Sequence, residues 1–230
     1  MDTTIPPIYL VGGSKGGVGK SFVSLALADY LQRQDMHAAL VETDTANPDV
    51  MKAVQDEIHC VAYSLDEADG WIGLVNFCDG HRDAAVIVNT AARNQAGVAR
   101  FGAMLAGTLG ELQRRLVVLW VINRQRDSLE LLREFGTTFP DATTHVVRNG
   151  YFGAADKFTL YKDSNIRKGI EAKGKSLDFP DLADRVSDDL RSQRLSVGKA
   201  AQTLPIGQRA ELLRWRALYD AMFAGVIADA

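Results

Sequence analysis

Residues 12–21 read Gly12-Gly13-Ser14-Lys15-Gly16-Gly17-Val18-Gly19-Lys20-Ser21. An apolar run precedes them and an apolar-periodic segment follows, which predicts a strand, a glycine loop and the first turn of a helix. Glycines let successive backbone N–H groups turn inward, and a helix N-terminus attracts anions. The segment therefore predicts a phosphate-binding loop, with Lys20 on the β- and γ-phosphates of a nucleotide and the Ser21 hydroxyl on Mg²⁺. The alternative is a flexible glycine turn with solvated lysines, which the flanking strand and helix patterns disfavour.

Two features set this loop apart from the general pattern. Ser14 stands where the first glycine is expected, and Lys15 adds a second lysine. The run from Lys15 to Ser21 resembles the deviant Walker A loop of the ParA/MinD ATPases. The resemblance implies a P-loop ATPase that binds ATP and Mg²⁺, in which Lys15 reaches across a dimer interface to the phosphates held by the partner. The nucleotide-binding residues that it implies in and beside the loop are Ser14, Lys15, Gly16, Gly17, Val18, Gly19, Lys20, Ser21 and Phe22.

Composition limits the classes of protein that the chain can belong to. It has 230 residues, 47% of them hydrophobic and 24% charged, with a net charge of −3 and neither half strongly basic. These values suit one soluble globular unit and do not by themselves indicate a nucleic-acid binder. No apolar stretch approaches the roughly 18 residues of a membrane span. The two cysteines, Cys60 and Cys78, are too few and too far apart for a disulfide framework or an iron–sulfur cluster, which predicts free thiols and a cytoplasmic location.

A second predicted strand, residues 38–41, leads into acidic residues. Strand, helix and strand within about 35 residues predict a right-handed βαβ unit and a parallel sheet, which binds ligands at the carboxyl ends of its strands. Asp44 matches the position where the ParA/MinD family has an Asp that orients or activates the attacking water, and we also expect it at the metal with Ser21. Glu42 falls where several members have a first acid, and Asp49 is a looser match. The alternative for Asp44 is a turn or helix-capping residue.

The strand predicted over residues 83–90 departs from the family. It resembles the Walker B strand in position, but Asn89 replaces the expected aspartate. An amide can hydrogen-bond to a magnesium-bound water but supplies no negative charge. Either Glu42 compensates, or magnesium affinity and turnover are reduced. Residues 94–113 that follow are predicted to be a loop and a glycine-interrupted helix.

Two further strands are predicted to end at the same rim. The clearest strand, residues 116–124, ends in Asn123 and Arg124, which resemble the family's adenine-binding corner; a simple strand-end turn is the alternative. The strand at residues 144–149 is followed by a loop beginning at 151–153 that would cover the nucleotide.

The C-terminal part is predicted to be helical over residues 182–195 and 206–227. The chain end lacks the lysines and arginines that a membrane-anchoring helix uses, so a packed or dimer-contacting helix is favoured. Residues 196–204 only faintly resemble the start of a helix-turn-helix.

Together these observations predict an α/β fold: a mostly parallel P-loop NTPase sheet with helices on both faces and a helical C-terminal extension. We expect the ATPase domain at residues 1–180 and the extension at 181–230, packed on the same domain. The predicted function is a nucleotide-dependent dimerisation switch with slow ATP hydrolysis, serving plasmid partition, transfer or cargo positioning, with a protein partner and DNA as a candidate partner. The pattern looks most like ParA-like proteins found with plasmid mobilisation genes. The alternatives are a nucleotide-binding scaffold subunit with little hydrolysis and a P-loop small-molecule kinase.

Overall fold

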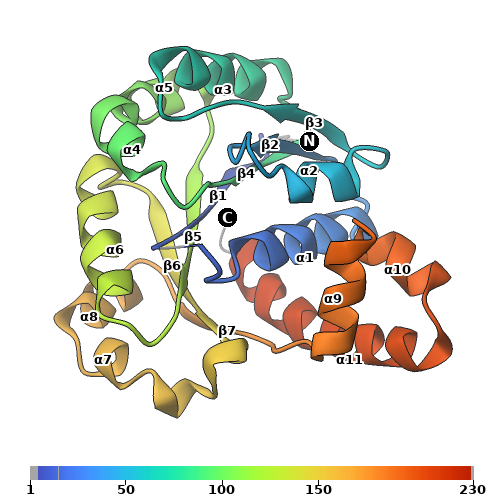
Figure 1. Ribbon diagram of the computed structural model, residues 1–230. Coiled ribbons are helices and arrows are strands. Elements are labelled where there is room, and N and C mark those ends of the chain that lie inside the picture. Colours follow the sequence, from blue (N-terminus) through green and yellow to red (C-terminus); the bar gives the residue numbers. More distant parts are fainter. Residues whose placement is uncertain (1–4, 15, 229–230) are drawn as a thin grey trace.

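The computed structural model describes residues 5–14 and 16–228, which form one sheet with helices on both faces (Figure 1). The sheet has seven strands in the order β3-β2-β4-β1-β5-β6-β7, and every pair of neighbours is parallel. The predicted mostly parallel sheet is thus confirmed. The strands are β1 (Ile8–Gly13), β2 (Ala38–Glu42), β3 (His59–Ala62), β4 (Ala85–Asn89), β5 (Leu116–Ile122), β6 (Thr143–Asn149) and β7 (Ser176–Phe179).

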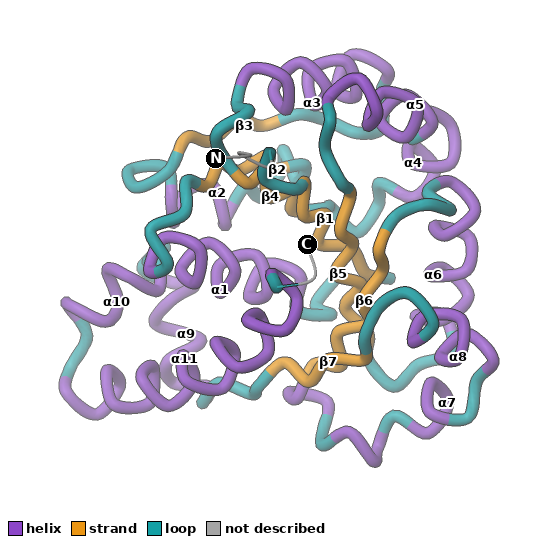
Figure 2. The backbone as a smooth tube through the Cα atoms, turned by 180° about the vertical axis from the view of Figure 1, so that it is seen from behind, coloured by secondary structure: helices purple, strands orange, loops and turns teal. Residues whose placement is uncertain are grey.

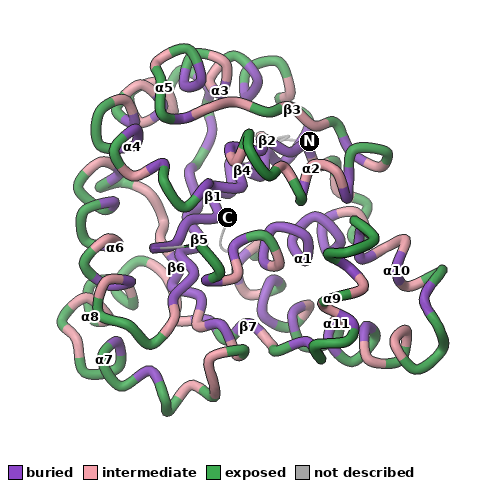
Figure 3. Tube along the Cα trace, in the orientation of Figure 1, coloured by how far each residue is buried: buried purple, intermediate pink, exposed green. Residues whose placement is uncertain are grey.

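Alternate residues of each central strand enter two different hydrophobic clusters, because successive side chains of a strand point to opposite faces. In β1, Tyr9 and Val11 belong to one cluster, whereas Ile8 and Leu10 belong to the other. The central strands are buried throughout, as expected of a parallel sheet covered on both sides (Figure 3).

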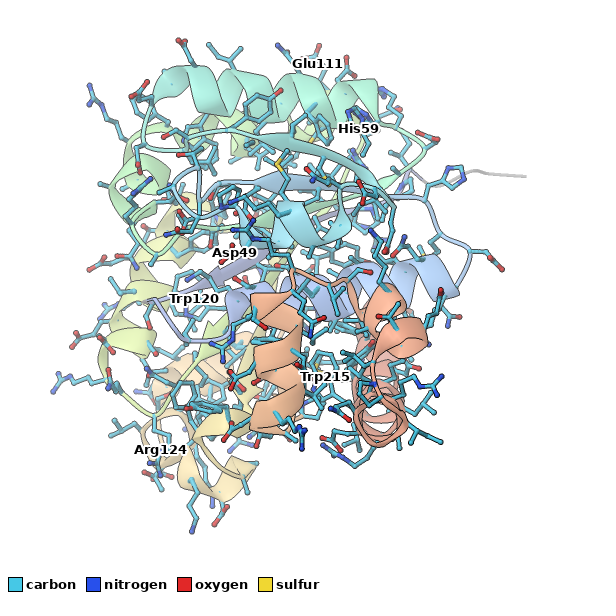
Figure 4. The ribbon with its side chains drawn as sticks, turned by 45° about the vertical axis from the view of Figure 1, so that its right-hand side comes forward. Asp49, His59, Glu111, Trp120, Arg124 and Trp215 are labelled. Atoms are coloured by element: carbon cyan, nitrogen blue, oxygen red, sulfur yellow. The ribbon has the colours of Figure 1, made fainter. Side chains whose placement is uncertain are left out.

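The first face carries the helix that follows the glycine loop and the C-terminal helices (Figures 1 and 2). The helices on this face are α1 (Lys20–Arg33), α2 (Asp49–Val54), α9 (Asp184–Ser192), α10 (Val197–Thr203) and α11 (Ile206–Ile227). Trp215 of α11 is fully buried, and its ring contacts those of Phe22 in α1 and Phe179 in β7 (Figure 4). The C-terminal helices therefore share a core with the loop helix.

The second face carries the helices from the middle of the chain. They are α3 (Ala68–Gly80), α4 (Gln95–Phe101), α5 (Ala103–Leu112), α6 (Asp127–Thr138), α7 (Thr159–Lys162) and α8 (Asn165–Glu171), with two 3₁₀ turns, η1 (Gly150–Phe152) and η2 (Ala155–Lys157), before α7. The segment predicted as a loop and a glycine-interrupted helix forms two helices that meet at Gly102. A Cβ at Gly102 would crowd Thr138 and Phe139, so close packing against the end of α6 explains the glycine there.

No helix within the described residues is long and apolar enough to cross a membrane. Cys60 is partly buried and Cys78 is buried, and both are free thiols. Residues 196–204 form α10, which packs against α1 and α11. The boundary at residue 180 between an ATPase domain and a helical extension stays a prediction.

Candidate nucleotide-binding site

The glycine loop connects β1, the middle strand, to α1 at the carboxyl edge of the sheet. Gly17 and Gly19 both have positive φ, 77° and 108°, a backbone region that side chains with a Cβ rarely adopt. Gly19 is also the residue before α1, so its conformation directs the first turn of that helix toward the loop. The glycines at these two positions are therefore required by the turn itself.

Two asparagines at strand ends hold the loop, one at each end. Asn149, the last residue of β6, donates from Nδ2 to the Val18 carbonyl at 2.8 Å, and a Cβ at Gly19 would overlap this amide. At the other end, the Ser128 hydroxyl donates to Asn123 Oδ1 at 2.8 Å. Because that hydroxyl has one hydrogen, the 2.9 Å contact between the Ser14 and Ser128 hydroxyls is donated by Ser14.

Next to the loop lies a first cavity of about 230 Å³, which we call the loop hollow. Eight of the predicted site residues line it, from the loop, the start of α1 and the segment that follows β2. Its lining is Gly16, Gly17, Val18, Gly19, Lys20, Ser21, Phe22, Asp44, Asn47, Asn89, Thr90, Ala91, Ala92 and Arg191.

A second cavity of about 300 Å³, the aromatic hollow, adjoins the first, since Gly17, Gly19, Phe22 and Arg191 line both. Its other walls come from the ends of β6 and β7 and from two C-terminal helices. They are Asn149, Tyr151, Phe179, Pro180, Asp181, Leu182, Asp184, Ser187 and Trp215. The loop hollow offers glycine backbone and a lysine, while the aromatic hollow offers rings and two carboxylates. The pair thus suits a ligand with an anionic end and an aromatic end.

The electrostatics of the loop hollow centre on Lys20. Burial lowers the pKa of its ammonium to about 8, and the carboxylates of Asp44 and Glu42 partly oppose that effect. The two acids favour the charged form of Lys20, and a buried cation beside a glycine nest is well suited to bind phosphate.

Glu42 is the buried acid of the site. β2 and β4 pair so that Glu42 lies beside Asn89, whose Nδ2 donates to both carboxylate oxygens at 3.0 and 3.1 Å. The Asp44 backbone N–H donates to the same carboxylate at 3.0 Å, and Ser24 in α1 donates to Asn89 Oδ1 at 2.9 Å. Burial raises the pKa of Glu42 to about 7, against the lowering effect of these hydrogen bonds. The carboxylate that is missing from β4 is therefore present one strand away, behind Asn89.

The residues suit Mg²⁺, which prefers oxygen ligands and keeps several waters. Ser21 and Asp44 both line the loop hollow, and their side-chain oxygens would hold the ion together with nucleotide oxygens. Asn89 also lines this hollow, but its oxygen already accepts from Ser24. The metal site thus has one carboxylate at the hollow, that of Asp44, whose Oδ1 also accepts from the Asn47 backbone N–H at 3.1 Å, as in the turn role that was the alternative for this residue.

The structure does not bring all predicted residues to the two hollows. Ser14 is buried at the start of the loop, and Asn123 is tied to it through Ser128. Arg124 lies with Leu160 on the α7 side of the molecule, well apart from Trp215 in Figure 4. The adenine-binding role of Asn123 and Arg124 stays a prediction. Asn149, unlike these two residues, lines the aromatic hollow. Lys15 lies outside the described residues.

Residues that sequence reasoning missed come from β6, β7, α9 and α11. Asn149 and Phe179 are paired in the register of β6 and β7, so both strands end at the aromatic hollow. The polar end of the 144–149 strand and the aromatic loop after it were the available signal, and Tyr151 does line this hollow. Arg191 and Trp215 had no local motif that could have identified them.

The sheet is all parallel, and a glycine loop joins its central strand to the next helix, beside a cavity lined by Lys20 and Ser21. These features define a P-loop nucleotide-binding protein. A sequence model of the CobQ/CobB/MinD/ParA nucleotide binding domain matches residues 9–139. The chain is also 55% identical to Protein MobD of Acidithiobacillus ferrooxidans over 223 residues, 96% of this chain and 98% of the relative. The chain therefore belongs to the CobQ/CobB/MinD/ParA nucleotide-binding domain family, which confirms the predicted ParA/MinD relationship.

Solved structures show the same fold at low sequence identity. The MinD cell division protein of Aquifex aeolicus has a TM-score of 0.54 at 9% identity, covering 90% of this chain and 95% of its own. The cell division protein FtsY of Thermotoga maritima has a TM-score of 0.53 at 16% identity, covering 77% and 64% of the two chains. These similarities confirm the predicted P-loop NTPase fold.

Glu42 should make the stability of the nucleotide-free protein fall as pH rises. Its folded pKa of about 7 lies above the ordinary value of 4.5, so its contribution is complete below about pH 4.5 and is lost as pH rises through 7. Between pH 5 and pH 8, the free energy of unfolding of the wild type should fall by about 2–3 kcal/mol relative to that of Glu42→Gln, which has no group to titrate at this position. Urea unfolding across this range measures the difference. Glu67→Gln, at an exposed carboxylate, is the control, and a Glu42→Gln curve parallel to the wild type would contradict the prediction.

Proposed function

We propose that the protein binds ATP with Mg²⁺ in the two adjoining hollows and acts as a nucleotide-dependent dimerisation switch with slow hydrolysis. The observation that carries the proposal is the convergence of Lys20 and Ser21, from α1, and Asp44, from the segment after β2, on one cavity beside the glycine loop. The triphosphate fits the loop hollow, where the backbone nest and Lys20 provide the positive charge. The ribose and base fit the aromatic hollow.

In this assignment each residue has a separate task. Lys20 binds the β- and γ-phosphates, and Ser21 and Asp44 hold the metal through oxygen atoms. Bound Mg²⁺ would supply positive charge to offset the charge on the phosphates. Asp44 also orients the attacking water, because it is the carboxylate that lines the loop hollow. The base lies beside the rings of the aromatic hollow and near Asn149. Asn149 Nδ2 donates to Val18 and its Oδ1 accepts from the Tyr151 N–H, which leaves one N–H and one lone pair for the base edge.

Dimerisation is proposed from the family relationship and from the two-lysine loop. A γ-phosphate contact made by Lys15 across the interface would exist only in the ATP-bound dimer, so the nucleotide would shift the population toward dimer. Hydrolysis would remove that contact and release the subunits. The cytoplasm is the proposed location.

The proposed process is plasmid mobilisation or a related transfer or partition step. The 55% identity to a relative named Protein MobD, over nearly the full length of both chains, supports this assignment. A dimer formed on ATP would present one surface to a partner protein, with DNA as the alternative.

A nucleotide-binding subunit with little hydrolysis is the second candidate, and Asn89 is the observation that favours it. The residue at the end of β4 lies at the loop hollow but carries no charge, and the nearest buried acid, Glu42, is hydrogen-bonded behind it. Such a site keeps the phosphate-binding groups while weakening the hold on the metal.

The switch is tested by measuring the oligomeric state with light scattering, without nucleotide, with ADP and with ATP·Mg²⁺. We expect a dimer only with ATP, and its loss in Lys15→Ala and in Lys20→Ala, because each lysine contributes a phosphate contact. Circular dichroism controls for folding of both variants. ATP binding without any change in oligomeric state would contradict the switch, and a dimer indifferent to nucleotide would favour the second candidate.

The two strand-end asparagines provide a matched pair for locating the base. Asn149→Ala should weaken ATP binding about fivefold to tenfold and reduce the preference for ATP over GTP, because it removes hydrogen bonds to the loop and to the base edge. Asn123→Ala should leave that preference unchanged, since Asn123 does not line the aromatic hollow and its Oδ1 already accepts from Ser128 and from the Gln125 N–H. The ratio of ATP to GTP dissociation constants is the measurement. If only Asn123→Ala lost the preference, the base would bind beside Asn123 at the end of β5, as the sequence predicted.

Asn89→Asp separates the two candidate functions. If the missing charge limits the metal, the substitution should lower the Mg²⁺ concentration needed for half-maximal ATP binding by several-fold and raise ATP turnover. Turnover is measured as phosphate release at fixed ATP and varied Mg²⁺. Asn47→Asp, which also lines the loop hollow, controls for the effect of added charge alone. An unchanged Mg²⁺ dependence in Asn89→Asp would show that Glu42 already supplies the charge.

A further inference from the structure

Arg191 lies where the loop hollow and the aromatic hollow meet. It is the only described residue outside the loop and the start of α1 that lines both. It comes from α9, far along the chain and beyond residues 9–139, which the family model matches. The helix packs on the same face of the sheet as α1 (Figure 1). A cation is therefore brought to the site by a part of the chain that the family match does not cover.

The contacts of Arg191 leave it able to exchange partners. Its guanidinium lies over the Phe22 ring, 5.7 Å from the centroid, and its NH2 is 2.9 Å from Asp188 Oδ1. The two charged side chains are 64% and 71% exposed. An exposed pair of this kind contributes little to stability, so the guanidinium can turn from Asp188 to a stronger anion at little cost.

The distribution of charge tells which part of a ligand Arg191 meets. The loop hollow is lined by the glycine nest, Lys20 and one acid, Asp44. The aromatic hollow, by contrast, is lined by two acids, Asp181 and Asp184, and by no lysine of the described residues. A phosphate chain is thus attracted to one side and repelled from the other. Arg191 lies at the boundary, where the phosphate chain of a bound nucleotide joins its sugar. A guanidinium has the planar donors that suit phosphate oxygens.

We propose that Arg191 is a phosphate-binding residue of this nucleotide site, and that its contact ties α9 to the presence of the nucleotide's phosphates. The inference rests on the proposed nucleotide binding and adds to it a residue and a responding helix. Phe22, beneath the guanidinium, holds it at the junction of the hollows before a ligand arrives.

The test compares the binding of ADP and adenosine to the wild type, Arg191→Ala, Arg191→Lys and Arg185→Ala. Arg185 lies on the same helix, is exposed and lines neither hollow, so it controls for loss of a positive charge. We expect ADP to bind Arg191→Ala about tenfold or more weakly, with partial recovery in Arg191→Lys and no change in Arg185→Ala. Adenosine, measured by ligand-observed NMR, should bind all four proteins within about twofold.

Hydrogen exchange provides a readout of the tie to α9. ADP should slow the exchange of the amides of residues 184–192 in the wild type and in Arg185→Ala. With ADP raised to equal occupancy, Arg191→Ala should lose that protection but keep the protection of the glycine loop. Thermal unfolding of each protein without nucleotide shows whether the variants are folded, and Arg191→Gln replaces Arg191→Ala if the latter is not.

Each result decides between the claims. No ADP binding by the wild type would overturn nucleotide binding and this inference with it. Binding by the wild type and unchanged ADP affinity in Arg191→Ala would overturn the inference alone. Equal weakening of ADP and adenosine would make Arg191 a wall of the aromatic hollow, and equal weakening by Arg185→Ala would make the effect one of general charge. Both would overturn the phosphate contact.

Discussion

The hydrogen bond from Asn149 Nδ2 to the Val18 carbonyl is the constraint on which the site depends. Val18 immediately precedes Gly19, whose left-handed backbone starts α1, so this bond fixes the loop where it becomes a helix. It forms because β6 ends level with the loop, two strands away from β1 in the sheet. Two features require glycine at position 19: its positive φ and the Asn149 amide that a Cβ would displace. The conformation of the loop therefore depends on the order of the strands in the sheet.

Much of the fold follows from local patterns, because every central strand is a short apolar run and the loop fixes the first βαβ unit. The places of the loop residues and of Asp44 were predictable for the same reason, since they follow directly or closely after β1 and β2. Asn149 and Asn123 were not separable from sequence, because both are strand-end asparagines and only the strand order shows which one reaches the aromatic hollow. Arg191 depends on how α9 packs back onto α1, a long-range contact that no local pattern encodes.

In this site the buried carboxylate lies on β2, one strand away from its expected place on β4. Glu42 and Asn89 are paired residues of β2 and β4, so an amide on one strand and a carboxylate on the other occupy adjacent places at the same edge. The amide donates to the carboxylate and accepts from Ser24 in α1, which joins both strands to the loop helix. Compared with an acid on β4 and an amide on β2, the present arrangement keeps the hydrogen bond but places the charge farther from the metal ligands. The hydrogen-bond frame and the charge distribution of such a site are therefore separate properties.

The attachments of α1 decide which part of the molecule can respond to the loop. Near its far end, buried Asp29 accepts hydrogen bonds from Arg33, Arg216 and Tyr219, which clamps α1 to α11. Breaking a buried charged network of this kind costs about 3–5 kcal/mol, whereas an exposed ion pair such as Arg191 with Asp188 contributes about 0–1 kcal/mol. A change at the loop is therefore not absorbed by separating α1 from α11. Turning Arg191 away from Asp188, its neighbour on the same helix, costs far less, and under the proposal above this is the change that a bound nucleotide would require.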